Sequence, residues 1–570
     1  MRYLGLAIVV VMACRSSNSQ QSGDAPIGDA AMGPVDAPVA ADVTCQTLTP
    51  LPTGTCSVTA GSSSKLIEGN VLTPSTIFHG GQVAVSATGL ITCVGCNCAQ
   101  GGETVITCPD GTISPGLIDT HDHITYTQNS PPVATAERFD DRQQWREGLD
   151  GHTKIDPPGG ASVDQIRWGE LRHVMAGATS LVGSGGEGGL VRNLDKASLS
   201  NLGLGAVYFD TFPLDDVSGT RRTGDCNYGG TPTTAASIAS DTAYEPHTSE
   251  GVDATAHNEF LCETSATYDT TAPGTSNNIA IAKTSMIHAV GLLAADYQLM
   301  ASAGTGMVWS PRSNISLYGD TARITTAARL GVNIALGTDW LPSGSMNMLR
   351  ELACADTFNK TYMAGFLTDQ ELWAMVTSNA AKVTRMDSAV GTIKMGLFAD
   401  ITIFAGNSKA PFRSVLEAQP QDVALVMRAG TAIYGDDTVV SALATSCDAV
   451  NVCGTDKRVC VMNEIGETYT TLSTNVGAAM YPAFACAAPT NEPTCTPSRP
   501  TSVAGSTIYT GAITATDSDG DGIPDATDNC PTVFNPIRPM DNGMQPDADG
   551  DGMGDACDPC PLDATNTCPH

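Results

Sequence analysis

Between residues 116 and 394, short apolar segments alternate with longer stretches of helical character. The apolar segments include GATSLVGSG, LGAVYFDTF, TSMIHAVG, GTGMVWSP and VNIALGTDW. Repeated alternation of strand and helix is typical of a parallel sheet covered by helices. A closed barrel of eight such units takes about 250 residues. We therefore predict an α/β fold for this segment, a (β/α)8 TIM barrel.

Both flanks of this segment have the composition of strands. Residues 45–115 contain short alternating runs separated by Gly, Asn and Asp, and residues 395–440 return to the same pattern. The simplest account joins the two flanks in one composite β-sandwich domain. Residues 441–510 hold five cysteines and show little periodicity. We expect them to form a Cys-rich extension stapled by disulfides.

The chain begins with MRYLGLAIVVVMAC, which has one arginine, a short apolar run and then Cys14. This pattern predicts a signal peptide over residues 1–14, with a run too short to span a bilayer. The VMAC ending resembles a bacterial lipobox, which implies lipidation of Cys14; a plain signal peptide is the alternative. Residues 15–44 are rich in Ser, Ala, Pro, Gly and Asp and are expected to form a flexible linker.

The number of cysteines indicates the redox compartment of the protein, and the net charge limits the kinds of binding partner. Apart from Cys14, the 19 cysteines leave an even number, and an exported chain favours disulfides over metal sites, even for CVGCNC at 93–98. The net charge of -31 argues against nucleic acid as a partner. We expect a small-molecule substrate, membrane contact through the lipid anchor only, and a place on the outer membrane or surface of a bacterium. The oligomeric state stays open.

The segment PGLIDTHDHITYT contains His121 and His123 directly after an apolar run. On a strand, side chains at i and i+2 point to the same face, so both imidazoles could hold one metal ion. Active sites of TIM barrels lie at the C-terminal ends of the strands, so further ligands should follow later strands. The candidates in chain order are His247 with Glu250 three residues later, His288, and Asp339. Taken singly, they could be a surface loop, a core histidine and a helix N-cap.

Taken together, these residues form an ordered set of HxH, HxxE, H and D on strand ends. The set resembles the amidohydrolase superfamily, above all its cytosine deaminase and chlorohydrolase-like branch. PGLIDTHDH is similar to the family's first-strand signature, HTSE to its HxxE, and ALGTDW to its strand-eight aspartate. SPRSNISLYG resembles the segment after strand seven, and residues 377–404 resemble the closing segment. The resemblance covers roughly residues 60–435.

The resemblance implies a metal centre with one divalent ion, zinc or iron, and a position open for water. The implied ligands are His121, His123, His247 and Asp339. A metal of this kind lowers the pKa of its water. Asp339 would accept the water's proton, His288 would orient the water or polarise the substrate, and Glu250 would carry a proton to the leaving nitrogen.

Other branches of the superfamily hold two metals bridged by a carboxylated lysine on strand four. The chain has no lysine between Lys196 and Lys283, so the strand-four region around AVYFDTF cannot supply one. This favours a single metal, with a bridging Glu or Cys left open.

The predicted function is that of an exported metal-dependent hydrolase acting on a non-peptide carbon–nitrogen bond, with deamination of a heterocycle favoured. Imidazolonepropionase-like ring opening and hydrolysis of a small amide are the enzymatic alternatives. An alternative of another class is a non-catalytic calcium-binding surface or adhesion protein on a degenerate barrel. All the ligands that the resemblance implies are present, which argues against a barrel that has lost its catalytic site.

Residues 511–570 contain two copies of one aspartate pattern, DSDGDGIPDATDNCP and DADGDGMGDACDPCP. Alternating carboxylates, with Gly after the third, let a short loop wrap a hard cation with oxygen ligands, as calcium requires. The segment resembles thrombospondin type 3 repeats, which implies bound calcium. The implied calcium ligands are Asp517, Asp519, Asp521, Asp525 and Asp528 in the first copy, and Asp547, Asp549, Asp551, Asp555 and Asp558 in the second. We expect an accessory tail that loosens without calcium.

Some motifs carry weaker expectations. GSGGEGG at residues 183–189 lacks the Lys and Ser/Thr of a phosphate-binding loop, and we interpret it as a flexible loop over the site. Arg312 and Asn314 either face the substrate or brace their loop. Three further histidines have no motif position and are expected to be structural or surface residues; they are His152, His173 and His257.

Overall fold

The computed structural model describes residues 39–568. The predicted signal peptide and the lipidation of Cys14 lie outside these residues. Within residues 39–568, no helix is both long enough and apolar enough to cross a membrane.

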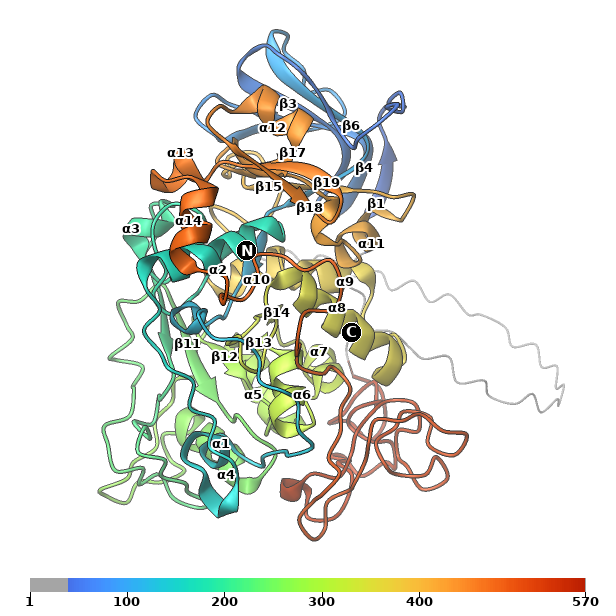
Figure 1. Cartoon of the computed structure of the whole chain (residues 1–570). Helices are drawn as coiled ribbons and strands as arrows, with labels where there is room; N and C mark the ends of the chain where they lie inside the picture. The colour runs from blue at the N-terminus through green and yellow to red at the C-terminus, as the bar shows by residue number, and fades with distance from the viewer. Residues whose placement is uncertain (1–38, 569–570) are drawn as a thin grey trace, which may run out of the picture. The chain divides into compact units, whose positions relative to one another are not determined.

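Within the described part of the chain, eight short parallel strands close into a barrel (Figure 1). They are β7 (Leu117–Asp119), β8 (Ala178–Leu181), β9 (Arg192–Asn193), β10 (Val207–Asp210), β11 (Ala243–Thr248), β12 (Ser285–His288), β13 (Gly306–Trp309) and β14 (Ile334–Leu336). Strands β7 to β9 form one parallel sheet and β10 to β14 another.

Backbone hydrogen bonds join these two sheets into a ring. Val207 N donates to Leu194 O over 2.9 Å next to β9 and β10, and Thr120 N donates to Leu336 O over 3.4 Å next to β7 and β14. The predicted TIM barrel is therefore confirmed. Its strands are short, and all except β10 are buried throughout, as expected for a parallel sheet enclosed by helices.

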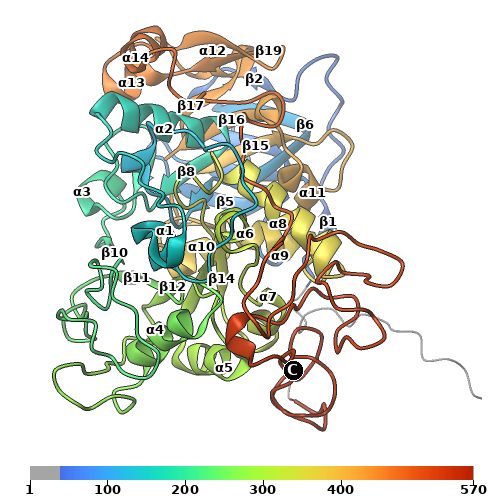
Figure 2. The same ribbon diagram turned by 60° about the horizontal axis from the view of Figure 1, so that its bottom comes forward.

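Helices lie between and around the barrel strands (Figures 1 and 2). They are α1 (Arg142–Glu147), α2 (Val163–Met175), α3 (Ala197–Ser200), α4 (Ala254–Thr264), α5 (Ala294–Ala303), α6 (Pro311–Tyr318), α7 (Ile324–Arg329), α8 (Met348–Tyr362), α9 (Asp369–Ala374) and α10 (Ser378–Val383), with the short 3-10 helices η1 (Ile124–Tyr126) and η2 (Leu149–Gly151). Their ends follow local chemistry. Ser162 and Gln165 form a capping box at the start of α2, and Gly319, with a φ of 71°, ends α6.

The two flanks of the barrel form one eleven-stranded sheet in the described residues. Its strands are β1 (Ala41–Thr44), β2 (Ser57–Thr59), β3 (Ser62–Leu72), β4 (Thr76–Val85), β5 (Ile91–Gly95), β6 (Glu103–Pro115), β15 (Ile401–Ala405), β16 (Val423–Arg428), β17 (Thr431–Asp436), β18 (Asp448–Val452) and β19 (Thr455–Val459). The flanks meet where β6 pairs antiparallel with β15, with Ile113 opposite Ile403. The composite β domain is thus built from both flanks as expected.

Two segments differ from the expected boundaries. Part of the expected linker 15–44 forms strand β1, which pairs with β4, and the neighbouring Cys45–Cys96 disulfide fixes it there. Part of the expected extension 441–510 forms β18 and β19, which continue the sheet past residue 440. The buried Lys457 ammonium secures this edge by donating to Val423 O over 2.9 Å and pairing with Asp436.

The remaining helices accompany this sheet and the segment after it. They are α11 (Pro411–Leu416), α12 (Asp437–Leu443), α13 (Val461–Ile465), α14 (Tyr469–Val476), and the 3-10 helices η3 (Pro420–Asp422) and η4 (Pro539–Asp541).

All eighteen cysteines of the described residues pair into nine disulfides, which confirms the disulfide expectation. The pairs are Cys45–Cys96, Cys56–Cys108, Cys93–Cys98, Cys226–Cys262, Cys354–Cys495, Cys447–Cys460, Cys453–Cys486, Cys530–Cys557 and Cys560–Cys568. The Cys354–Cys495 bridge ties α8 of the barrel to the C-terminal extension.

The C-terminal segment packs against the barrel helices (Figure 2). The ring of Phe534 lies against the rings of Phe358 and Tyr362 on α8. The guanidinium of Arg538 pairs with Asp320, and Arg323 pairs with Asp541. The tail therefore shares a buried interface with the barrel.

Candidate metal centre

The predicted site residues follow four barrel strands and meet at the carboxyl ends of those strands. His121 and His123 come after β7, and His247 is the penultimate residue of β11. His288 ends β12, and Asp339 follows β14. Parallel barrel strands present their C-terminal ends on one face, so residues far apart in the sequence become neighbours.

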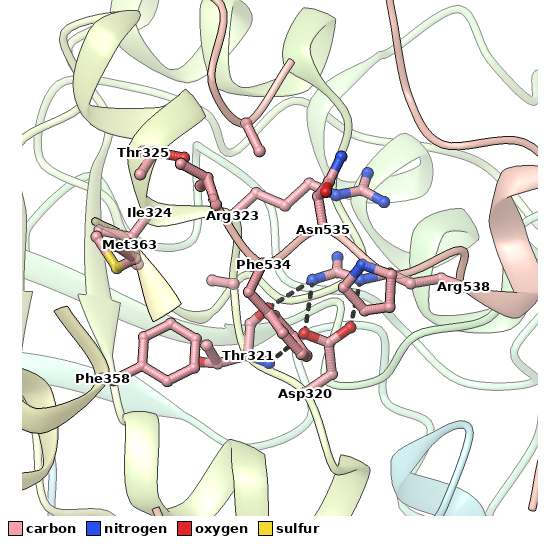
Figure 3. A pocket seen from close by; sticks show the side chains of 14 residues that line it. Asp320, Thr321, Arg323, Ile324, Thr325, Phe358, Met363, Phe534, Asn535 and Arg538 are labelled. Carbon is pink, nitrogen blue, oxygen red and sulfur yellow. Dashed lines mark hydrogen bonds and ion pairs between the residues drawn. The ribbon is translucent and has the colours of Figure 1, made fainter. Parts of the chain in front are cut away.

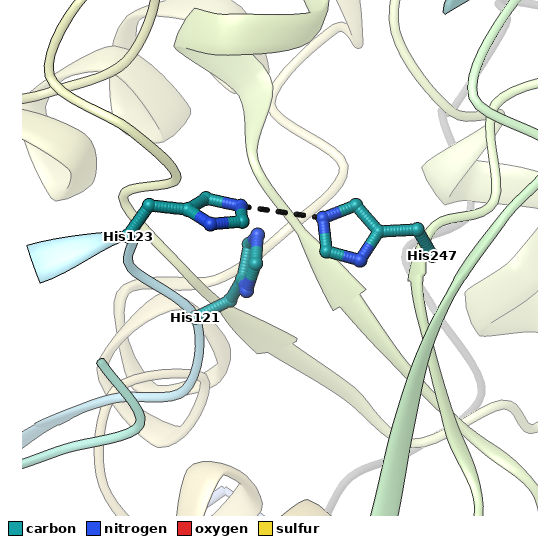
Figure 4. Close-up of side chains that lie close together, drawn as sticks. All are labelled: His121, His123 and His247. Atoms are coloured by element: carbon teal, nitrogen blue, oxygen red, sulfur yellow. Dashed lines mark hydrogen bonds between the residues drawn. The ribbon is translucent and has the colours of Figure 1, made fainter. Parts of the chain in front are cut away.

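Three imidazoles converge on one point. The ligand atoms of His121, His123 and His247 lie within 4.8 Å of one another, and Figure 4 shows the three rings side by side. The Nε2 atoms of His123 and His247 are 3.3 Å apart. Asp339 Oδ1 lies 3.3 Å from His121 Nε2 and 3.5 Å from His123 Nε2. The four groups thus surround a space of the size of one ion.

The donor atoms fit a divalent metal. His247 Nδ1 donates to the carbonyl oxygen of Asp210 over 3.2 Å, which leaves the lone pair on Nε2, facing the other histidines. Among the described residues, the buried Nε2 of His121 has no hydrogen-bond partner. A buried polar atom left without a partner is costly, and a cation here would satisfy it. Nitrogen and carboxylate donors are those that zinc and related ions take in proteins.

The electrostatics of the site favour neutral imidazoles beside a charged carboxylate. Burial, together with the charge of His121, lowers the pKa of His123 to about 4. Burial and the neighbouring histidines hold the pKa of His247 well below its ordinary value. Burial opposes ionisation of Asp339, but the surrounding imidazoles outweigh it, so the pKa of Asp339 lies well below its ordinary value. These are the protonation states that metal binding requires.

The backbone at the site is held in uncommon conformations. Asp339 has a φ of 58° and His288 a φ of 69°. Non-glycine residues with positive φ carry strain of order 1–3 kcal/mol and cluster at functional sites. Gly337 is needed for the approach of β14, because a Cβ there would lie 2.7 Å from His121 Cβ. The fold therefore holds Asp339 close to His121 at an energetic cost.

Glu250 lies beside the centre and is positioned by two aromatic residues. Tyr318 Oη donates to Glu250 Oε1 over 2.8 Å, and Trp145 Nε1 donates to Tyr318 Oη over 2.8 Å. Glu250 Oε2 is 3.7 Å from His288 Nε2. Burial and the charge of Asp339 raise the pKa of Glu250 to about 7. A carboxyl group with this pKa can take up and release a proton near neutrality.

Helix α6 supplies contacts to both Asp339 and His288. Ser313 Oγ donates to Asp339 Oδ2 over 2.6 Å, and Asn314 Nδ2 lies 3.0 Å from His288 Nδ1. An amide donor at that nitrogen requires the His288 tautomer with its proton on Nε2. Arg312 is buried and donates to Ser345 Oγ. These contacts favour the alternative in which Arg312 and Asn314 brace their own segment over the one in which they face the substrate.

A second cluster of polar side chains lies next to the candidate metal ligands, around Asp119 at the end of β7. Asp119 Oδ2 accepts from Thr338 Oγ1 over 2.6 Å, which links β7 to β14. His173 Nε2 is 2.9 Å from Asp122 Oδ2 and its Nδ1 is 3.6 Å from Asp119 Oδ2. His173, which has no motif position in the sequence, is therefore buried behind the HxH segment.

A cavity of about 530 Å³ opens onto the centre. Glu250, His288 and Asp339 reach it from the barrel. Its other walls include several aromatic rings and cationic side chains, namely Tyr126, Trp145, Phe212, Trp340, Arg146 and Lys154. The rings of Trp145 and Trp340 lie 5.2 Å apart at the cavity. The size is typical of a site for a small molecule.

The structure brings together all six barrel residues singled out from the sequence. The glycine-rich segment 183–189 contributes Ser184 to the cavity wall. It is tied down by Asp195, which accepts from Gly185 N, and by Lys196, which donates to Gly186 O. Sequence patterns missed Tyr318 and Ser313, although both stand in the SPRSNISLYG segment. Phe212 ends the AVYFDTF segment, whose pattern predicts a strand and not a cavity wall, and Trp145 stands in no motif.

The two aspartate patterns form two loops with the same internal hydrogen bonds. Gly520 N and Gly522 N donate to Asp517, as Gly550 N and Gly552 N donate to Asp547. In each loop the first three aspartates offer oxygens within 4.8 Å of one another.

Burial distinguishes the two loops. Asp519 and Asp521 are fully buried, whereas Asp551 is exposed. Within residues 39–568, Asp519 Oδ2 and Asp521 Oδ2 have no hydrogen-bond partner. Burial and neighbouring carboxylates raise the pKa of Asp519 to about 8 and that of Asp521 to about 7. A cation in the first loop would offset this cost.

Two known family models match parts of the chain. Residues 230–433 match the Amidohydrolase family, and residues 514–538 match the thrombospondin type 3 repeat. These matches confirm the resemblance to the amidohydrolase superfamily and, for the first aspartate copy, the resemblance to thrombospondin type 3 repeats. The first match includes His247, Glu250, His288 and Asp339.

Individual relatives cover a small part of the chain. A 5-methylthioadenosine/S-adenosylhomocysteine deaminase from Teredinibacter turnerae is 32% identical over 121 residues, which is 21% of this chain and 27% of that protein. The enzyme of the same name from Thermoanaerobacter pseudethanolicus is 34% identical over 119 residues, 20% of this chain and 28% of that protein. The chain thus spans under a third of the length of these relatives.

Solved structures were also compared with the chain. An adenosine deaminase from Xanthomonas campestris with bound zinc aligns with 65% of this chain and 92% of its own, at a TM-score of 0.45 and 18% identity. Atrazine chlorohydrolase from Arthrobacter aurescens, complexed with zinc, aligns with 65% of this chain and 95% of its own, at a TM-score of 0.46 and 16% identity.

Proposed function

We propose that this protein is a metal-dependent hydrolase that cleaves a non-peptide carbon–nitrogen bond, with deamination of a heterocycle as the favoured reaction. The observation that carries the proposal is the convergence of His121, His123, His247 and Asp339 at the mouth of the barrel, with Glu250 and His288 beside them. The names of the two curated relatives, both deaminases, support the same chemistry.

His121, His123, His247 and Asp339 would hold one divalent ion, zinc or iron. Strand β10, the fourth of the barrel, has the sequence VYFD and offers no lysine, which supports a single metal. The chemistry supplied by such an ion would be Lewis-acid activation of water near neutrality.

The side chains around the centre have complementary proton-transfer roles. Asp339 is ionised and can accept a proton from the attacking water, while Ser313 keeps its carboxylate oriented. His288 donates from Nε2 toward the reacting carbon's substituent. Glu250, with its pKa raised to about 7 by burial, delivers a proton to the departing nitrogen. Water adds to carbon, the carbon–nitrogen bond breaks, and the amine leaves as ammonia.

The lining of the cavity supports a flat substrate. Tyr126, Trp145, Phe212 and Trp340 provide ring faces, on which planar heterocycles stack favourably. A volume of about 530 Å³ suits a small heterocyclic compound better than a peptide chain. Ring opening of an imidazolone or hydrolysis of a small amide uses the same groups and serves as the comparison in substrate tests.

We further propose that the two aspartate loops bind calcium and that the protein is exported. The buried, unpartnered carboxylate oxygens of Asp519 and Asp521 support a cation site. Nine disulfides support an oxidising location. Lipidation of Cys14 and anchoring at the outer membrane or cell surface complete this proposal, with the membrane contacted through the anchor alone.

Elemental analysis of the full protein, produced in an oxidising compartment, tests the metal proposal. About one zinc or iron per chain is expected, with loss in both His121→Ala and Asp339→Ala. Purified protein should then release ammonia from aminated heterocycles, and imidazolones and small amides are the control substrates. A well-folded protein without barrel metal would overturn the enzyme proposal and favour a calcium-binding surface protein.

A further inference from the structure

Two arginines of the C-terminal extension are buried in the barrel behind the candidate site. Arg499 and Arg538 are each only 4% exposed. Long cationic side chains rarely become this buried unless several acceptors satisfy them. Their acceptors are backbone carbonyls and carboxylates of barrel segments that carry site residues.

Arg499 connects the two segments that enclose Glu250. Its guanidinium donates to Phe139 O over 2.9 Å and to Tyr318 O over 2.6 Å, and it pairs with Asp140. Tyr318 in turn donates to Glu250 Oε1. On the other side, Asp140 O accepts from Val252 N over 2.7 Å. Arg499 thus holds the end of α6 against residues 139–140, which are in turn hydrogen-bonded to the segment that follows Glu250.

Arg538 makes the equivalent connection behind His288. It pairs with Asp320 over 2.7 Å and donates to Val290 O over 2.6 Å and to Thr321 O over 2.5 Å (Figure 3). Val290 lies two residues after His288. The hydroxyl of Thr321 lies 3.3 Å from the Asn314 amide oxygen, and the same amide contacts His288 Nδ1.

The first aspartate loop packs directly on the segments that carry these arginines. A Cβ on Gly522 would lie 2.5 Å from Ile508 O and 3.1 Å from Tyr509 Cβ, so the loop backbone touches this strand-like segment. Tyr509 pairs through its backbone with Arg499, at 2.9 and 3.1 Å, and its hydroxyl donates to Gly319 O over 3.3 Å.

The same loop is joined to the segment before Arg538. The side-chain amide of Gln545 donates to Asp528 Oδ1 of the loop over 2.7 Å and to Asn535 Oδ1 over 3.0 Å, and Asn535 stands three residues before Arg538. The cavity between this segment and the barrel is only about 20 Å³, lined by Phe358 and Phe534 among others (Figure 3). The loop, both arginines and α6 therefore form one continuous packed unit.

We propose that Arg499 and Arg538 are positioning residues for Glu250 and His288, and that a cation in the loop 517–528 fixes them in place. The inference rests on the proposed function. It gives the tail a role in the reaction instead of the accessory role expected from the sequence. The second loop differs: its first three aspartates are less buried, and glycines 550 and 552 have open space around them. Within the described residues, its hydrogen bonds to the barrel come from Thr326 and Arg329 on α7, which carries no candidate site residue.

The variants Arg499→Gln and Arg538→Gln in the full protein test the positioning role. We expect kcat per barrel metal to fall about tenfold to a hundredfold, the range that small misplacements far from the chemistry cause, with KM changing less than about threefold. Arg499→Lys and Arg538→Lys keep the charge and should recover part of kcat. Arg329→Gln is the matched control, since Arg329 donates to Ala556 O from α7 and contacts no site residue.

Hydrogen exchange of residues 311–318, measured with and without calcium, provides a readout independent of turnover. Removal of calcium by a selective chelator, with barrel metal retained, should increase exchange in this helix. Asp521→Asn should do so in the presence of calcium, and more than Asp551→Asn.

The outcomes separate this inference from the proposed function. If the parent protein turns over a substrate and both Arg499→Gln and Arg538→Gln keep its kcat, the positioning role is overturned and the hydrolase proposal stays intact. Equal exchange with and without calcium would overturn the link from the loop to α6. If no substrate is turned over, the exchange experiment still decides whether the loop controls α6.

Discussion

The barrel centre and the first aspartate loop both gather ionisable side chains around a buried point, but different elements hold them. At the barrel centre, Asp339 N donates to His121 O over 2.9 Å, and His247 lies in β11, which pairs with β12. In the loop, Asp517, Asp519 and Asp521 lie on one short stretch without helix or strand. The barrel is therefore expected to keep its geometry without an ion, whereas the loop depends on one.

The raised pKa values of two carboxyl groups show the same contrast. Burial raises the pKa of Glu250 and of Asp521 to about 7, with Asp339 adding to the first and Asp528 to the second. Glu250 has Tyr318 as a hydrogen-bond donor and a neighbouring histidine, so its proton can move within the site. Asp521 lies among other aspartates, where a divalent cation would replace the proton. Under the proposed function, a pKa raised by burial would serve proton transfer at Glu250 and cation binding at Asp521.

The largest expected effect is that of His247→Ala on the barrel centre. Loss of this ligand should reduce bound metal to near zero and activity by more than about a hundredfold, a loss that changes outside the ligand shell already reach. The melting temperature should fall only slightly, because the backbone pairing of β11 with β10 and β12 remains and the variant loses the contact of the imidazole with Asp210 O. Elemental analysis, turnover and thermal unfolding measure the three quantities.

His257→Ala is the control for this variant. His257 pairs with Asp296 outside the site, so metal and activity should be retained. A His247→Ala protein that keeps its metal would contradict the assignment. A protein that unfolds on metal removal would contradict the distinction between barrel and loop.

The second prediction concerns Glu250→Gln. We expect kcat to fall about 10²–10⁴-fold, the usual contribution of general acid–base catalysis, with barrel metal unchanged. In the parent protein the protonated form of Glu250 delivers the proton, so kcat should decrease as pH rises through about 7. The variant should lack this step in its pH–rate profile. An unchanged profile would assign the proton transfer to another group.

The third prediction concerns calcium and the first loop. Calcium at a hundred times its dissociation constant stabilises a folded protein by about 2.7 kcal/mol. Asp521→Asn should lose most of this gain, because its buried oxygen is part of the proposed site. The free energy of unfolding with and without calcium measures the effect. An equal gain in variant and parent would show that the first loop does not bind calcium under these conditions.

The smallest effect is expected for Asp551→Asn in the second loop. Asp551 is exposed, and surface substitutions usually change stability by less than about 0.5 kcal/mol. Calcium stoichiometry should decrease while barrel unfolding stays the same. A barrel destabilised as strongly as by Asp521→Asn would remove the proposed difference between the loops.

The sequence predicts the barrel, and it also picks out the six residues that converge at the barrel's mouth, because both depend on local patterns. Apolar runs mark most strands, and a polar residue at the end of a run marks the site, as at His121 and Asp339. Strand β9 has only two residues and gives no periodic signal.

Long-range contacts are the part that sequence patterns do not reveal. Arg538 and Asp320 are 218 positions apart, and Arg499 and Tyr318 are 181 apart. Nothing in the sequence around Arg499 or Arg538 points to these distant partners. Strand β1 was hidden in a linker-like composition, because its partner β4 and the Cys45–Cys96 bridge determine its conformation.

The pairing of β6 with β15 also has a consequence for the time course of synthesis. Ile113 can pair with Ile403 only after about 290 further residues have been synthesised. At a synthesis rate of 5–20 residues per second this takes roughly 15–60 s. During that time the end of β6 is an unpaired strand edge, which invites association with other chains. Producing cells therefore have to keep the emerging polypeptide apart from its copies until the whole barrel has left the ribosome.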